Sequence, residues 1–97
     1  MPPLKITAII WLEDIVEKLE EKHGVRQEEV RQVLSNQPLF RLVEKGHRPG
    51  EDVYAALGRT NAGRYLTVFF VYKKDQRALV ISAREMTRPE RKAYERR

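Results

Sequence analysis

Three arginines stand at the ends of predicted strands, and their chemistry suggests an anion site in this 97-residue chain. Arg59 ends a first strand, Arg64 precedes a second and Arg84 ends a third. If these strands form an antiparallel meander, the three ends lie at one edge of the sheet, beside the start of a final helix. Guanidinium groups next to a helix N-terminus suit a phosphodiester and the negative charge that builds up in a phosphorane transition state.

A structural role for these arginines competes with the functional one. With four-residue loops on both sides of the middle strand, Arg84 faces one side of the sheet, while Arg59 and Arg64 face the other, beside Glu85. There they would be edge residues in surface ion pairs, which contribute little to stability. A bulge near Ala83, or curvature at the rim of the sheet, would bring the three together.

Histidines and aromatic residues are the other candidates for chemistry. His23 follows a predicted helix, where capping of the helix carbonyls is the simpler role, and His47 lies in a loop without an orienting carboxylate. Aromatic side chains on a basic sheet can stack on unpaired bases, although core packing or a protein interface is their more common role. The candidates are Tyr54, Tyr65, Phe69 and Tyr94.

The stretch from residue 53 to residue 84 must position these groups. Strands are predicted at 53–59, 65–72 and 78–84, because these segments are rich in β-branched and aromatic residues and the polar joints between them are typical of hairpins. The middle strand is apolar on both faces, so we expect it to be central.

Pairing Arg59 with Arg64 and Tyr72 with Arg77, across four-residue loops, predicts which residues share a face. The core face would carry Val53, Ala55, Leu57, Leu66, Val68, Phe70, Leu79, Ile81 and Ala83. The other face is expected to be an open floor of small residues between aromatic walls, on which a ligand or partner could lie. It would carry Tyr54, Ala56, Gly58, Tyr65, Thr67, Phe69, Val80, Ser82 and Arg84.

The remaining elements are predicted to complete one α+β domain over residues 1–97. Gly24 is expected to end the first helix, and Thr87 with Glu90 forms a capping-box pattern at the start of the last. The order β-α-α-β-β-β-β-α predicts an antiparallel sheet with two N-terminal helices on one face and a short C-terminal helix. In chain order these other elements are a strand at 5–11, helices at 12–22 and 27–35, an edge strand at 39–45, a loop at 46–50 and a helix at 88–96.

Charge and composition narrow the class of function. The net charge is +5, and it is uneven: residues 1–35 carry five Lys or Arg against seven Asp or Glu, whereas residues 36–97 carry fourteen against seven. A basic sheet and tail suggest a polyanion such as RNA or DNA, although moderate basicity also serves solubility. No cysteine and no bilayer-length apolar stretch are present. We therefore expect a soluble cytoplasmic protein that uses neither a metal nor another cofactor.

The C-terminal residues resemble a known signature. Ile81-Ser-Ala-Arg84 followed by Thr87-x-x-Glu90-Arg91-x-x-Tyr94 is similar to the end of BrnT toxins, small ribonucleases of bacterial type II toxin–antitoxin pairs with a RelE-like fold. Further matches are Trp11, Lys22-His23-Gly24-Val25, Pro38 and the segments 51–58 and 66–72. The resemblance implies metal-independent RNA cleavage by ribose 2′-hydroxyl attack. It also implies a ribbon-helix-helix, BrnA-like antitoxin as partner, in a toxin–antitoxin heterotetramer or with a toxin dimer.

The resemblance also implies roles for particular residues. Its matching positions are His23, Arg84, Arg91 and Tyr94. We expect Arg84 and Arg64 to hold the phosphate, His23 or Tyr94 to transfer protons, and the remaining RNA contacts to come from Arg59, Arg91, Tyr54 and Tyr65. Where the family often has Lys, Asn and Arg, this chain has Ile15, Leu19 and Val53.

These departures leave a second interpretation, a non-catalytic protein- or RNA-binding module of the same fold that has lost nuclease activity. Salt-dependent RNA binding without cleavage would select it. A structural or regulatory subunit indifferent to nucleic acid is a third interpretation.

Overall fold

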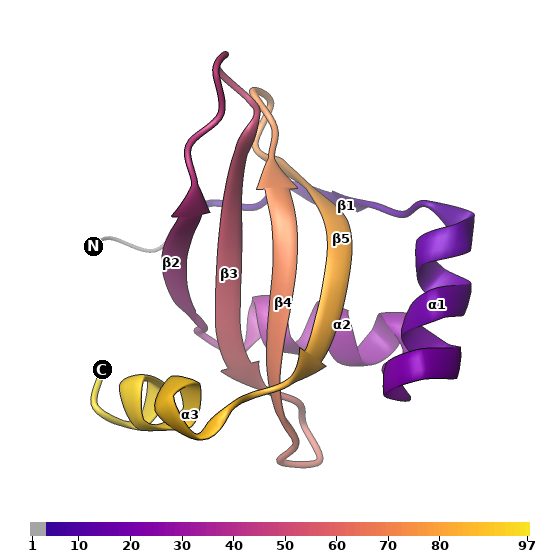
Figure 1. Cartoon of the computed structure of the whole chain (residues 1–97), viewed down its shortest axis with the longest axis vertical. Helices are drawn as coiled ribbons and strands as arrows, with labels where there is room; N and C mark the ends of the chain where they lie inside the picture. The colour runs from indigo at the N-terminus through magenta and orange to yellow at the C-terminus, as the bar shows by residue number, and fades with distance from the viewer. Residues whose placement is uncertain (1–3) are drawn as a thin grey trace.

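Five strands form one sheet in the computed structural model of the protein, which describes residues 4–97 (Figure 1). The predicted α+β class is confirmed, although the first strand is shorter than expected. Within the described residues, no helix has the length and apolar character needed to cross a membrane. In chain order the elements are β1 (Ala8–Ile10), α1 (Glu13–His23), α2 (Gln27–Ser35), β2 (Leu39–Glu44), β3 (Asp52–Arg59), β4 (Tyr65–Tyr72), β5 (Arg77–Glu85) and α3 (Arg88–Glu95).

The sheet has the strand order β1-β5-β4-β3-β2. Strands β2 to β5 form the antiparallel meander, with β4 at its centre and β2 at one edge, as predicted. Strand β1 pairs in parallel with β5, so the sheet is mixed and the expectation of a wholly antiparallel sheet is wrong. Short loops force antiparallel pairing within the meander, but residues 11–76 separate β1 from β5 and leave their relative direction free.

The helix ends follow from local sequence. Gly24 ends α1 in the left-handed conformation, with φ of 59°, and its N–H donates to the Glu20 carbonyl at 3.1 Å. At the other end of the chain, Thr87 and Glu90 form the predicted capping box. Its two bonds join Thr87 and Glu90 and hold the first turn of α3.

The main core lies between the sheet and the first two helices. In Figure 1, α2 passes behind the strands and α1 stands beside β5. Val30 and Val33 of α2 are fully buried together with Val68 and Phe70 of β4. The residues on this side define the covered face of the sheet.

The β3–β4 and β4–β5 hairpins have three-residue loops, so the predicted register is wrong. Each loop begins with a turn closed by a backbone hydrogen bond. The Gly63 N–H donates to the Thr60 carbonyl and the Gln76 N–H to the Lys73 carbonyl, both at 2.9 Å. Gly63 and Gln76 then adopt positive φ values of 91° and 69°. A turn followed by one left-handed residue is the usual three-residue hairpin loop.

The shorter loops shift the pairing by one residue and turn β3 over. Arg59 pairs with Tyr65 instead of Arg64, and Tyr72 pairs with Ala78 instead of Arg77. A one-residue shift moves every side chain of a strand to the opposite face. The residues that move to the covered face are Tyr54, Ala56, Gly58 and Val80, and those that leave it are Val53, Ala55, Leu57 and Leu79.

A bulge in β5 restores the predicted placement of its second half. The pairing steps from Phe70 with Val80 to Phe69 with Ser82, which leaves Ile81 as the extra residue. Ser82 and Arg84 therefore lie on the face opposite the two helices. This second face is called the open face below.

Candidate functional site

The open face carries one helix at its lower end. In Figure 1, α3 lies at the foot of the sheet on this side. Its Tyr94 is buried against Ala55 and Leu57 of β3, with Phe69 packed alongside. Leu57 is thus buried as predicted, but beneath α3 rather than beneath the first two helices.

An arginine and a glutamate form the central ion pair of this face. Arg84 Nη1 and Nη2 donate to Glu90 Oε1 and Oε2 at 2.6 and 3.0 Å. The Thr67 hydroxyl of β4 donates to Glu90 Oε1 at 3.0 Å, and the Thr87 N–H donates to the same oxygen at 2.8 Å. One carboxylate therefore joins β4, β5 and α3. These four residues are called the Glu90 cluster.

The surroundings of Glu90 keep it ionised. Burial alone raises its pKa, but the hydrogen bonds from Arg84, Thr87 and Thr67, together with the charge of Arg84, outweigh this and lower the pKa to about 2. The hydrogen bond to Glu90 raises the pKa of Arg84 against the opposing effect of burial. Both groups are charged at neutral pH, so Glu90 is poorly suited to act as a general base there.

Arg84 keeps unused donors despite this pairing. A guanidinium has five N–H donors. Two of those of Arg84 go to Glu90, and a third, on Nη1, goes to the Glu85 carbonyl at 3.2 Å. Within residues 4–97, the Nε–H and one Nη2 N–H have no partner. These two donors point the same way from the planar group, with the spacing that two phosphate oxygens need.

Arg84 and Glu90 border a pocket of about 350 Å³ on the open face. Ala55, Leu57 and Phe69 contribute apolar side chains to the pocket, and Arg41 on the edge strand β2 adds a second positive charge. A lining of apolar side chains with a few charged groups suits a ligand that is part anionic and part apolar. The other lining residues are Leu42, Val43 and Pro89.

Two more arginines of the open face gather around Tyr65. The guanidinium carbons of Arg59 and Arg91 lie 4.6 and 4.0 Å from the centre of the Tyr65 ring. The Tyr94 ring meets Tyr65 edge-on at 6.0 Å. The structure therefore brings Arg59, Arg84 and Arg91 onto one face. The Tyr65 ring, a candidate for stacking on bases, is thus already in contact with two guanidinium groups and with Tyr94.

Arg64 is not part of this group. Its side chain lies on the covered side, where Nη1 donates to the Gly24 carbonyl at 2.7 Å and Nη2 to the His23 carbonyl at 3.1 Å. Nη1 also pairs with Glu29 at 3.1 Å. Arg64 thus caps the end of α1 and joins it to the start of α2, so the expected gathering of three arginines is reduced to two. Glu29, Gly24 and His23 with Arg64 are called the Arg64 cluster.

Two other predicted site residues also lie away from Arg84. His23 ends α1, next to Arg64 on the covered side. Tyr54 was expected on the open face, but the register shift turns it into the core, where it stacks on Phe70 with 6.0 Å between ring centres. His47 lies in the loop between β2 and β3, at the opposite end of the sheet from Arg84.

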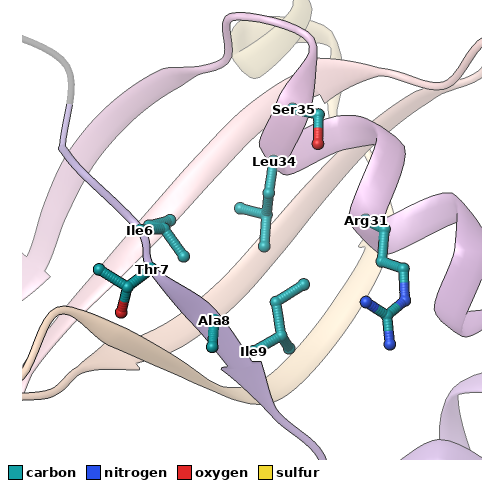
Figure 2. A pocket seen from close by; sticks show the side chains of 7 residues that line it. All are labelled: Ile6, Thr7, Ala8, Ile9, Arg31, Leu34 and Ser35. Carbon is teal, nitrogen blue, oxygen red and sulfur yellow. The ribbon is translucent and has the colours of Figure 1, made fainter.

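A second pocket, of about 300 Å³, lies between β1 and α2 (Figure 2). Ile6, Ile9 and Leu34 supply its apolar side chains, and Arg31 of α2 stands at one side. Its lining includes none of the predicted site residues. The open face therefore remains the candidate site.

Comparison with known families identifies the relatives of the chain. A family model described as "Ribonuclease toxin, BrnT, of type II toxin-antitoxin system" matches residues 11–90. The chain belongs to the BrnT family. The predicted resemblance is thereby confirmed, and a type II system implies an antitoxin as partner. The comparison with curated proteins finds no match.

The residues that depart from the BrnT pattern lie away from Arg84. Leu19 is 3% exposed within the main core, and Ile15 packs against the same cluster. Their apolar side chains suit this interface between α1 and the sheet. Val53 lies on the open face near the start of β3, at the far end from Arg84.

Three residues of the BrnT open face were missed as site residues. Glu90 was recognised only as a capping residue, although an arginine six positions earlier signals an ion pair across the turn. Thr67 was placed on the correct face without a role. On β2, Arg41 shares a face with Leu39 and alternates with Phe40 and Leu42, and this alternation was the available signal for its direction.

Proposed function

We propose that this BrnT-family chain is an endoribonuclease whose RNA site is the open face around Arg84. The observation that carries the proposal is the Arg84 guanidinium, held by Glu90 with two donors left over beside the pocket. Arg59, Arg91 and Arg41 on the same face offer contacts to neighbouring phosphates. The antiparallel meander with two helices on one face supports a RelE-like arrangement.

The proposed reaction needs no group beyond the RNA and the protein. The ribose 2′-oxygen attacks the adjacent phosphorus, the bond to the 5′-oxygen breaks, and a 2′,3′-cyclic phosphate and a 5′-hydroxyl form. The 2′-oxygen loses a proton and the leaving oxygen gains one. Arg84 would bind the non-bridging oxygens, whose charge increases in the transition state.

Proton transfer is assigned to Tyr94 in this proposal, because Tyr94 belongs to the open face and His23 does not. Since Tyr94 is buried against β3, this role requires its hydroxyl to reach the RNA. Arg91, one turn earlier on the same helix, would position the RNA backbone. Arg64 would support the fold around α1 rather than hold the phosphate, since its donors go to Glu29 and two backbone carbonyls.

The proposed antitoxin would cover the open face and exclude RNA. A BrnA-like, ribbon-helix-helix antitoxin with an acidic segment would match the charge of the surrounding arginines. The exposed side chains of Leu42 and Val43, at 49% and 53%, add apolar area beside the pocket. We expect the pair to act in the bacterial cytoplasm, as a heterotetramer or another toxin–antitoxin assembly.

The test is cleavage of RNA by the purified protein in the presence of EDTA. We expect fragments that end in 2′,3′-cyclic phosphate, and we expect the Arg84→Ala protein to lose this cleavage. Arg77→Ala is the control, because Arg77 pairs with Asp75 at the far end of β5. Intact RNA after incubation with wild-type protein, with and without ribosomes, would refute the enzymatic function.

A non-catalytic binding module is the second candidate. Two observations favour it: Ile15 and Leu19 pack in the core where relatives often have polar residues, and Glu90 partly neutralises Arg84. In that case, RNA or the antitoxin would bind to the same arginines with a strong salt dependence and no cleavage.

A further inference from the structure

Glu90 sits where three elements of the open face meet, and its side chain is 16% exposed. Its partner Thr67 is fully buried on β4, and Thr87 holds Glu90 from the start of α3. These two bonds fix the carboxylate independently of Arg84. Arg84 then pairs with an anion that is already in place.

We infer that Glu90 is a positioning residue for the proposed cleavage, which fixes Arg84 so that its two unused donors bind the reacting phosphate, and that Thr67 in turn fixes Glu90. The inference rests on the proposed function for its catalytic consequence. The holding of Arg84 itself can be measured without RNA.

The geometry favours positioning over blocking. Glu90 pairs with the outer edge of the guanidinium, through Nη1 and Nη2, whereas the side edge, Nε–H and Nη2, remains for a ligand. A phosphate can therefore bind without displacing Glu90. An arginine side chain that is held before the substrate binds loses less conformational freedom in the reaction.

The charge of Glu90 and its hold on Arg84 affect different measured quantities in the Glu90→Gln variant. Removing a negative charge beside a phosphate site strengthens RNA binding by simple electrostatics. A Gln amide, however, presents one oxygen and one NH2 group, so it cannot accept both Arg84 hydrogen bonds. The positioning role therefore predicts slower cleavage with RNA binding equal to or tighter than that of the wild type.

The experiment compares kcat, RNA affinity and Arg84 NMR signals in Glu90→Gln, Thr67→Val and Glu28→Gln proteins. For Glu90→Gln we expect kcat to fall by about 10- to 30-fold with no loss of affinity. Thr67→Val removes one hydroxyl and keeps the shape, so we expect a kcat about threefold lower. Glu28→Gln is the matched control, since Glu28 also lies in the first turn of a helix but is exposed on α2.

The NMR arm detects positioning without activity. In 15N-labelled wild-type protein, restricted rotation should give separate Nη1 and Nη2 signals for Arg84. We expect them to merge in Glu90→Gln and to stay separate in Glu28→Gln. If the wild type cleaves no RNA, the proposed function fails, while these signals still decide whether Glu90 fixes Arg84.

Two results would overturn the inference. One is a folded Glu90→Gln protein with wild-type kcat, and the other is Arg84 signals that stay separate in that variant. If Glu90→Gln does not fold, the Thr67→Val protein decides. Unchanged kcat and unchanged Arg84 signals in that protein would contradict the inference that Thr67 fixes Glu90 and that Glu90 fixes Arg84.

Discussion

The Glu90 cluster and the Arg64 cluster contain the same pair of side chains in two different settings. In each, an arginine meets a mostly buried glutamate: Glu90 is 16% exposed and Glu29 is 14% exposed. Burial opposes ionisation in both, yet the arginine and backbone hydrogen bonds lower the pKa of each carboxylate. Ion pairing alone therefore does not distinguish a binding residue from a structural one.

The difference lies in what else each guanidinium contacts. Arg64 also donates to the His23 and Gly24 carbonyls, which lack partners at the end of α1, so it acts as a helix cap. Arg84 also donates to one carbonyl, but within residues 4–97 its Nε–H and one Nη2 N–H have no partner, and its side chain lines the pocket of the open face. The contacts to helix-end carbonyls in one case, and the place at a pocket in the other, separate the structural arginine from the candidate ligand-binding one.

The comparison predicts the largest effect on cleavage at Arg84. Arg84→Lys keeps the charge but loses the paired donors, so we expect the rate of RNA cleavage to fall by about 100-fold. Arg64→Lys should change the rate by less than about threefold at a temperature where both variants are folded. Rates are measured on one RNA substrate, with folding checked by circular dichroism. A larger loss of rate for Arg64→Lys would reverse the assignment of the two clusters.

The second largest effect is a loss of stability on substitution in the Arg64 cluster. Arg64→Ala leaves Glu29 and two helix-end carbonyls without their donor, so we expect the free energy of unfolding to decrease by about 1–3 kcal/mol. Urea unfolding measures it. Arg77→Ala, which removes only an exposed pair with Asp75, should change stability by less than about 0.5 kcal/mol. Equal stability of the two variants would contradict the capping role of Arg64.

The sequence predicted the faces of β4 but not those of β3, and loop length explains why. The alternation within β4 is a property of the strand itself, so Thr67 and Phe69 were placed correctly. The face of β3 depends on the loop that joins it to β4. Gly63 signals a three-residue loop, but the four-residue alternative places the same polar residues in a turn, and one residue reverses the strand.

The correct placement of Arg84 came from two deviations that cancel. The loop at Gln76 shifts the pairing of β5 by one residue, and the bulge at Ile81 shifts it by one more. A non-glycine residue at positive φ gives little sequence signal, and the bulge depends on packing across the sheet. The proximity of Arg64 to Glu85 was predicted, and Arg64 Nη2 lies 3.6 Å from Glu85 Oε1. The bonds from Arg64 to Glu29 and to the end of α1 could not be predicted, because they depend on how the helices pack on the sheet.

Acid should reduce the stability that both clusters contribute, because it protonates their glutamates. At neutral pH this contribution should be complete. The pKa of Glu90 is lowered from 4.5 to about 2, so its contribution to stability is complete above pH 4.5 and is lost as the pH falls towards 2. We expect the stability difference between wild type and Glu90→Gln, on the order of 1 kcal/mol above pH 5, to shrink across this window. Urea unfolding at several pH values measures it, with Glu28→Gln as the control. A difference that instead grows on acidification would mean that Glu90 is not held as an anion.

The smallest expected effect concerns the arginines around Tyr65, which share the open face with the Glu90 cluster. Arg59 contacts the Tyr65 ring and, among the described residues 4–97, its guanidinium donates one hydrogen bond, of 3.4 Å to the Gly63 carbonyl, so most of its donors remain for a phosphate. We expect Arg59→Gln to weaken RNA binding by about threefold and to make the dependence of log affinity on log salt shallower by about 0.7, the value for one lost contact to a single strand. Titrations of RNA at several salt concentrations measure both quantities. Arg77→Gln removes the same charge at the far end of β5 and should leave the slope unchanged. If the two variants alter the slope equally, RNA binding depends only on the net charge of the protein, and the proposal that the open face is the RNA site is refuted.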